Sequence, residues 1–138
     1  MSRRIRLYLV ALAVWLGMFA LAFANGALRV LVLEPWLGDV ALPMSGILGI
    51  ILIGTVAALF ALRARPNLGD AFVIGTGWFV LTLGIEMVLM LFAGRSTSEV
   101  ADAFTFAAIA KGDLFAPMLV WMAAVPAAMV LTRTKSDG

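Results

Sequence analysis

Apolar residues fill four long stretches of this chain, and polar residues gather in the short segments between them. Because an α-helix rises 1.5 Å per residue, about 20 apolar residues cross a hydrocarbon core of about 30 Å. Each stretch has about that length. We therefore expect one transmembrane domain over residues 1–138, with membrane-spanning helices at about 7–28, 43–63, 70–93 and 113–131.

The apolar pattern favours helices over a membrane β-barrel. Only helices and closed barrels satisfy all of their backbone hydrogen bonds in lipid. A barrel strand alternates apolar and polar residues, whereas residues 47–53 are apolar throughout. A composition that is 64% hydrophobic agrees with this interpretation. The predicted fold class is an all-α membrane protein, a four-transmembrane-helix bundle.

The segments between the spans predict how the helices are joined. Residues 34–39 contain proline and glycine and predict an outer loop. Asn25-Gly26 lies near the outer end of the first span, which either bends there or continues outward. The connection at 63–70 is short, so the second and third spans are expected to be antiparallel neighbours. Asp70 is the expected N-cap of the third span.

The last connection predicts a short helix at the membrane surface. Ser96 and Glu99 have the spacing of a capping box, and they precede apolar residues at helical intervals over 100–110. We expect one short outer helix there. In the fourth span, Pro126 is expected to produce a kink.

The charges predict the orientation. Three cations fall on the outer side if four helices alternate: Arg29, Arg95 and Lys111. The other seven are Arg3, Arg4, Arg6, Arg63, Arg65, Arg133 and Lys135. By the positive-inside rule, both termini lie in the cytoplasm of a bacterial inner membrane. The basic start resembles a signal peptide, but its apolar run exceeds the usual 7–15 residues, so we expect a retained first span.

The composition removes several kinds of chemistry. The sequence has no cysteine and no histidine, which excludes thiol redox chemistry and thiolate- or imidazole-bound metals. It also contains no phosphate-binding or nucleophile-elbow motif. We expect no catalytic residue, no metal and no cofactor. The basic residues lie at span ends rather than on one patch, so a nucleic-acid partner is not expected.

One acid lies deep within a predicted span. Counted from Asp70 at the helical rise, Glu86 is about 24 Å along the third span, in the outer half of the membrane. Polar residues of the other spans fall at a similar depth. We therefore predict an intramembrane polar cluster, structural or ligand-binding, of Asn25, Arg29, Ser45, Thr82, Glu86 and Asp113.

Three roles are open for Glu86, because a carboxylate in hydrocarbon normally faces a partner, a cavity or water. It could form a structural pair with Arg29, bridged by Asn25, that holds the first and third spans together. It could instead bind a proton, a cation or a substrate, or extend toward the outer interface. The pattern favours the structural pair.

Several short motifs are spread over most of the chain. They are Asn25-Gly26-x-x-Arg29, Pro35-Trp36-Leu37-Gly38, Ser45-Gly46, Trp78-x-x-x-Thr82-x-x-x-Glu86 and Gly112-Asp113-Leu114-Phe115. Together they resemble an uncharacterised family of small four-span bacterial integral membrane proteins. The resemblance implies a four-helix fold and a special role for Asn25, Arg29 and Glu86, but it implies no reaction.

The short loops and the small residues within the spans favour a role in packing. We expect a non-catalytic accessory subunit of a larger membrane complex, whose partners are the lipid bilayer and other membrane proteins or further copies of itself. An alternative is a small oligomeric transporter or channel with Glu86 as a proton or cation site. A third is a membrane enzyme that acts on lipid or quinone through Glu86 and Arg29.

Overall fold

The structure, a computed structural model, describes residues 1–94, 96–102 and 104–136. Four long helices dominate it: α1 (Arg3–Leu28), α3 (Ala41–Ala64), α4 (Leu68–Phe92) and α7 (Phe115–Ser136). No strand occurs in the described part of the chain. The prediction of an all-helical protein is confirmed.

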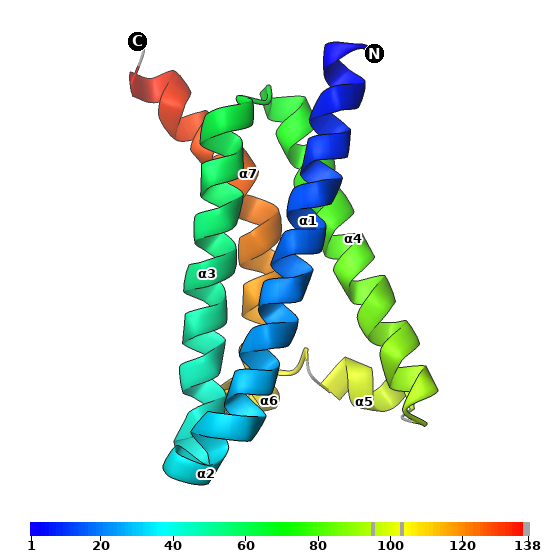
Figure 1. The fold of residues 1–138 in the computed structure, drawn as a ribbon, viewed down its shortest axis with the longest axis vertical. Helices are drawn as coiled ribbons and strands as arrows, with labels where there is room; N and C mark the ends of the chain where they lie inside the picture. The colour runs from blue at the N-terminus through cyan, green and yellow to red at the C-terminus, as the bar shows by residue number, and fades with distance from the viewer. Residues whose placement is uncertain (95, 103, 137–138) are drawn as a thin grey trace.

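Three helical stretches are long and apolar enough to cross a membrane: Arg3–Ala64, Leu68–Phe92 and Phe115–Lys135. The first contains 62 residues, because helical turns connect α1 to α3 without a loop. These turns are η1 (Arg29–Leu33), α2 (Glu34–Leu37) and η2 (Gly38–Val40). The chain reverses direction within them, so α1 and α3 pack side by side (Figure 1).

The predicted outer loop at 34–39 is therefore wrong. Pro35 lies in the first turn of α2. Proline is tolerated there, because the backbone N–H groups of a first turn have no hydrogen-bond acceptor within the helix. The reversal occurs instead near Gly38, whose φ of 55° and ψ of −131° suit a residue without a side chain. The helix also passes through Asn25 and Gly26 without a break, and the first departure from α geometry begins at Arg29.

The start of α4 differs from the prediction by one turn. The N-cap is Asn67, whose Oδ1 accepts a hydrogen bond from the Asp70 backbone N–H at 2.8 Å. Asp70, the predicted cap, lies in the first turn, and its carboxylate is used elsewhere. It accepts hydrogen bonds from Tyr8 Oη at 2.7 Å, Arg4 Nε at 3.0 Å and Asn67 Nδ2 at 2.9 Å. This network ties the start of α1 to the start of α4.

Helix α7 lies between α3 and α4 and packs against both (Figure 1). Over the described residues the backbones of α3 and α4 come close in few places, and their side chains meet at Phe60 and Trp78. Apart from this contact they are not the packed neighbours that the short connection predicted. Small residues explain the arrangement, since Gly75 of α4 lies against the backbone of Ala123 and Gly54 of α3 lies against Trp121. The faces of α3 and α4 that carry these glycines therefore pack against α7 rather than against each other.

Two tryptophans organise the core. Trp78 Nε1 donates to the Ala11 carbonyl oxygen at 3.0 Å, and Trp15 Nε1 donates to Thr82 Oγ1 at 2.9 Å. Both bonds connect α1 to α4 and satisfy polar groups in an apolar interior. The buried core cluster around them consists of Ala11, Trp15, Met18, Ile53, Ala57, Phe60, Ile74, Trp78, Leu119, Met122 and Val125.

The connection between α4 and α7 contains two short helices, α5 (Thr97–Asp102) and α6 (Phe106–Ala110), where one had been predicted over 100–110. The second forms separately because Thr105 Oγ1 accepts from the Ala108 N–H at 3.2 Å and caps it. Glu99 Oε2 accepts from the Ser96 N–H at 2.8 Å, as the capping-box spacing predicts. Arg95 lies outside the described residues.

Both chain termini lie at one end of the molecule, together with the turn between α3 and α4 (Figure 1). The seven cations predicted to share one side belong to this end, whereas Arg29 and Lys111 belong to the opposite end. Pro126 lies inside α7, which changes direction along its length (Figure 1). This bend is consistent with the predicted kink.

Candidate functional site

All six residues of the predicted polar cluster line one cavity of about 480 Å³. The cavity lies between α1, α3, α4 and α7, in the half of the molecule away from the termini. Its polar lining consists of Asn25, Arg29, Ser45, Thr82, Glu86 and Asp113. The helical rise predicted their similar depth, and the structure places them around the same space.

Most of the remaining lining is apolar. Trp15 and Met18 of α1 are buried and line the cavity, as do Met118 and Met122 of α7. Methionine side chains adapt to irregular shapes. The cavity therefore combines a polar region with an apolar wall, which suits an amphipathic group.

Asn25 connects α1 to α3 rather than to α4. Its Nδ2 donates to the Ser45 carbonyl oxygen at 2.8 Å, and Gly49 leaves room for it, since a Cβ at 49 would lie 3.2 Å from that nitrogen. The Ser45 hydroxyl is itself used, because it donates to the Leu42 carbonyl oxygen at 3.0 Å. Asn25 Oδ1 is buried and accepts no hydrogen bond from the described residues.

Arg29 pairs with Glu34, so the predicted Arg29–Glu86 pair bridged by Asn25 is wrong. Arg29 Nε lies 3.4 Å from Glu34 Oε1. The reason is the π-helical turn η1, in which the Glu34 N–H donates to the Arg29 carbonyl oxygen. In a π-helix, residues five apart are brought onto one face. The prediction had assumed α-helical periodicity at this point.

Glu86 has no hydrogen bond and no ion pair with any residue that the structure describes. Its side chain is half-buried and lines the cavity. Thr82, one turn earlier on the same face, already accepts the hydrogen bond from Trp15. The carboxylate is therefore free to interact with a group from outside this chain.

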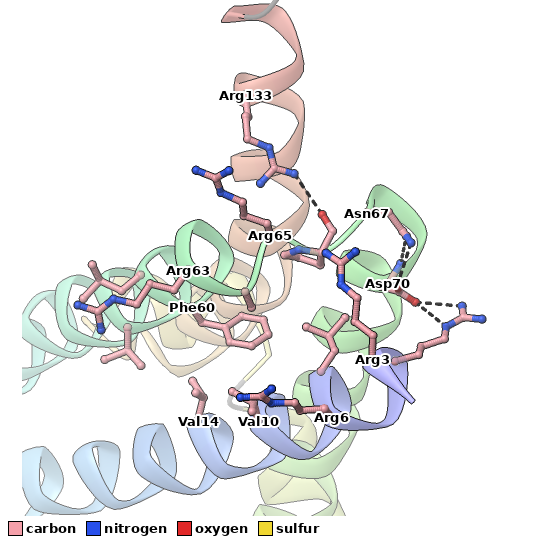
Figure 2. Close-up of a pocket in the computed structure, with 16 residues that line it drawn as sticks. Arg3, Arg6, Val10, Val14, Phe60, Arg63, Arg65, Asn67, Asp70 and Arg133 are labelled. Carbon is pink, nitrogen blue, oxygen red and sulfur yellow. Dashed lines mark hydrogen bonds and ion pairs between the residues drawn. The ribbon is translucent and has the colours of Figure 1, made fainter. Parts of the chain in front are cut away.

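A second cavity, of about 1130 Å³, lies at the end that holds the termini (Figure 2). Six arginines line it: Arg3, Arg4, Arg6, Arg63, Arg65 and Arg133. The charge pattern of the sequence placed these cations on one side without predicting a site. Helix α1 does carry a sequence pattern that indicates this site. Two arginines and two valines lie at helical intervals and face the cavity: Arg3, Arg6, Val10 and Val14.

Comparison with known protein families, with curated proteins and with solved structures gives no match for this chain. The family resemblance noted above therefore stays a prediction. Within the described residues, no group of three or more acids, histidines or cysteines could hold a metal ion. What the cavity lined by Glu86, Asn25 and Arg29 offers chemically is a free carboxylate, an amide oxygen and a guanidinium beside apolar side chains.

Proposed function

We propose that this chain is a four-span inner-membrane protein without a catalytic role, which packs against another membrane protein at the cavity lined by Glu86. One observation carries the proposal: Glu86 lines this cavity and lacks a partner among the described residues. An acid within a membrane costs about 3 kcal/mol on insertion scales. A partner helix that supplies a donor would offset this cost.

The helix lengths support four spans. The 62-residue helical run contains two antiparallel helices of 26 and 24 residues, and each exceeds the roughly 20 that cross a bilayer. With α4 and α7 they make an even number of spans, in agreement with termini at the same end (Figure 1). The arginines at this end favour a cytoplasmic location for both termini.

Helix α4 is little covered in its second half. Its buried residues all lie in the first half, namely Asp70, Ala71, Ile74, Gly75 and Trp78. It leans away from α1 toward the end that holds α5 (Figure 1). Beyond Glu86 its exposed side chains are large and apolar, namely Met87, Val88, Leu89, Leu91 and Phe92. A partner helix placed here would cover this surface and also reach Glu86.

A second candidate function rests on the same carboxylate. Glu86 and Asp113 line one cavity, and such a pair of acids could hold a proton or a small cation in an oligomeric transporter or channel. Glu86→Gln separates the candidates, because it keeps the shape of the side chain and removes its charge.

Glu86→Gln is expected to reduce association with the partner about tenfold, the effect of losing one charged hydrogen bond. The measurement is recovery of membrane proteins that co-purify stoichiometrically with the tagged full chain in mild detergent. Glu99→Gln, an exposed change outside the cavity, is the control and should leave recovery unchanged. Equal recovery with both variants, together with loss of ion flux in vesicles for Glu86→Gln alone, would instead favour the transporter.

The proposed topology predicts the activity of fused reporters. A reporter that functions only in the cytoplasm should be active when fused after Gly138 and inactive when fused after Lys111. The second position lies at the opposite end of the molecule, just after α6. The reverse result would invert the orientation, and equal activity at both positions would show that α7 does not cross the membrane.

A further inference from the structure

We propose that the cavity beside the termini binds an anionic phospholipid, with the phosphate among the arginines and an acyl chain between α1 and α3 (Figure 2). We call this cavity the arginine cavity. The inference depends on the membrane placement proposed above. It does not depend on Glu86 or on a protein partner, which concern the opposite end of the molecule.

Most guanidinium groups that line the arginine cavity have no hydrogen-bond or ion-pair partner among the described residues. Among the residues that the structure describes, Asp70 is the one acid that lines it, and Tyr8, Arg4 and Asn67 already donate to its carboxylate. Arg133 Nη2 donates to the Pro66 carbonyl oxygen at 3.2 Å. Over the described residues the other four lining arginines form no side-chain hydrogen bond or ion pair: Arg3, Arg6, Arg63 and Arg65.

Guanidinium groups bind phosphate oxygens through paired hydrogen bonds. Figure 2 shows arginines from α1, from the α3–α4 turn and from α7 gathered around the same space. Because they come from separate elements, a single phosphate group could be approached from several sides. A basic cavity between spans on the cytoplasmic side is also the location at which anionic headgroups bind membrane proteins.

The shape of the cavity favours a lipid over a soluble anion. Its walls continue from the arginines into apolar side chains, Val10 and Val14 from α1 and Val56 and Phe60 from α3. Val10 lies one helical turn beyond Arg6 and Val14 one turn further, so charge gives way to an apolar wall along one face. Free phosphate would fill the charged part only. A phospholipid matches both parts.

Arg65 provides further support, because its backbone is strained. It follows α3 in the left-handed conformation, with φ 46° and ψ 57°. Glycine is the residue that usually ends a helix in this way, and a side chain there has an energetic cost. An arginine at this position brings a guanidinium to the cavity at the expense of local stability. Because glycine adopts this conformation readily, Arg65→Gly removes the charge without destabilising the turn.

The experiment uses the full chain purified in detergent and titrated with phosphatidylglycerol or phosphatidylcholine. Native mass spectrometry counts the bound lipids, and thermal unfolding reports stabilisation. We expect one phosphatidylglycerol to be retained and to raise the melting temperature, whereas phosphatidylcholine has little effect. Equal effects of the two lipids would overturn the proposal.

Arg65→Gly should weaken phosphatidylglycerol binding about fivefold, as expected for one cation near an anionic headgroup. The melting temperature without lipid should be unchanged or higher. Lys135→Ala is the matched control, since it removes one charge at the same end but Lys135 does not line the cavity. Its effect should stay below about twofold, because exposed charges contribute little. Equal effects of both variants would reduce the site to general surface charge and contradict the proposal.

Val14→Trp tests the acyl chain, because it fills the apolar part and leaves every charge in place. We expect phosphatidylglycerol binding to be lost. Val10→Trp, at an exposed position on the same wall, tests the same point if Val14→Trp does not fold. Inorganic phosphate is the other arm of the experiment. If phosphate stabilises the chain as strongly as phosphatidylglycerol and the tryptophan variants bind both normally, the ligand is a soluble anion and the lipid assignment is wrong.

Discussion

Gly75→Ala is expected to separate α4 from α7 and to lower the free energy of unfolding by about 3 kcal/mol, the upper range for overpacking a filled interior. A Cβ at position 75 would overlap the carbonyl oxygen of Ala123 and lie 3.0 Å from its carbonyl carbon. These are backbone atoms, so no side-chain rotation relieves the clash. The measurement is reversible unfolding of the purified chain in mixed micelles.

Gly77→Ala is the matched control. It lies two residues away on the same helix, and a Cβ there would meet no atom within 4 Å. Alanine favours helical backbone over glycine by about 1 kcal/mol, so stability should stay the same or increase. If the two variants are equally stable, α4 does not pack on α7 through Gly75.

Trp78→Ala is expected to cost about 4 kcal/mol of unfolding free energy, as for other large-to-small changes at buried aromatic positions. The side chain is 2% exposed. Its ring meets Phe60 edge to face, with centroids 5.4 Å apart. The substitution also removes the donor to the Ala11 carbonyl oxygen. The expected loss therefore combines a cavity between three helices with the loss of one hydrogen bond between α1 and α4.

Trp36→Ala serves as the comparison, since that side chain is 85% exposed on α2. Its loss should cost less than about 1 kcal/mol, as is usual at exposed positions. Trp78→Phe should fall between the two, because it keeps most of the ring and loses the hydrogen bond. The test is the ranking of the three unfolding free energies, and similar values for both alanine variants would contradict the described core.

The depth of polar residues along a span could be predicted from the sequence. Asn25, Thr82 and Glu86 line one cavity because their distance from the helix ends follows from a constant rise per residue. This property is local to each helix, as is the apolar character that identifies the long helices. Neither requires knowledge of how the helices are arranged.

Features that depend on departures from regular geometry could not be predicted. Arg29 pairs with Glu34 because a π-helical turn changes the face on which it lies. The start of α4 was predicted one turn too late, because Asn67 caps the helix while the Asp70 carboxylate bonds to α1.

The spatial order of the helices also could not be predicted from the sequence pattern. A short turn joins α3 to α4, yet α7 is inserted between them. Loop length fixes only where two helix ends meet. The contacts along their length depend on which small residues face which neighbour, as at Gly54 and Gly75.

The Asp70 network fixes one end of α4, while its other end is largely uncovered. The Gly75–Ala123 contact and the Trp15–Thr82 hydrogen bond hold the helix further along. The segment beyond Thr82 is therefore the part that can tilt. From Thr82 to Phe92 it measures about 15 Å at the helical rise, so a tilt of roughly 5° would move the tip by about 1 Å. The uncovered end of α4 can thus adjust to a neighbouring molecule while the rest of the bundle keeps its packing.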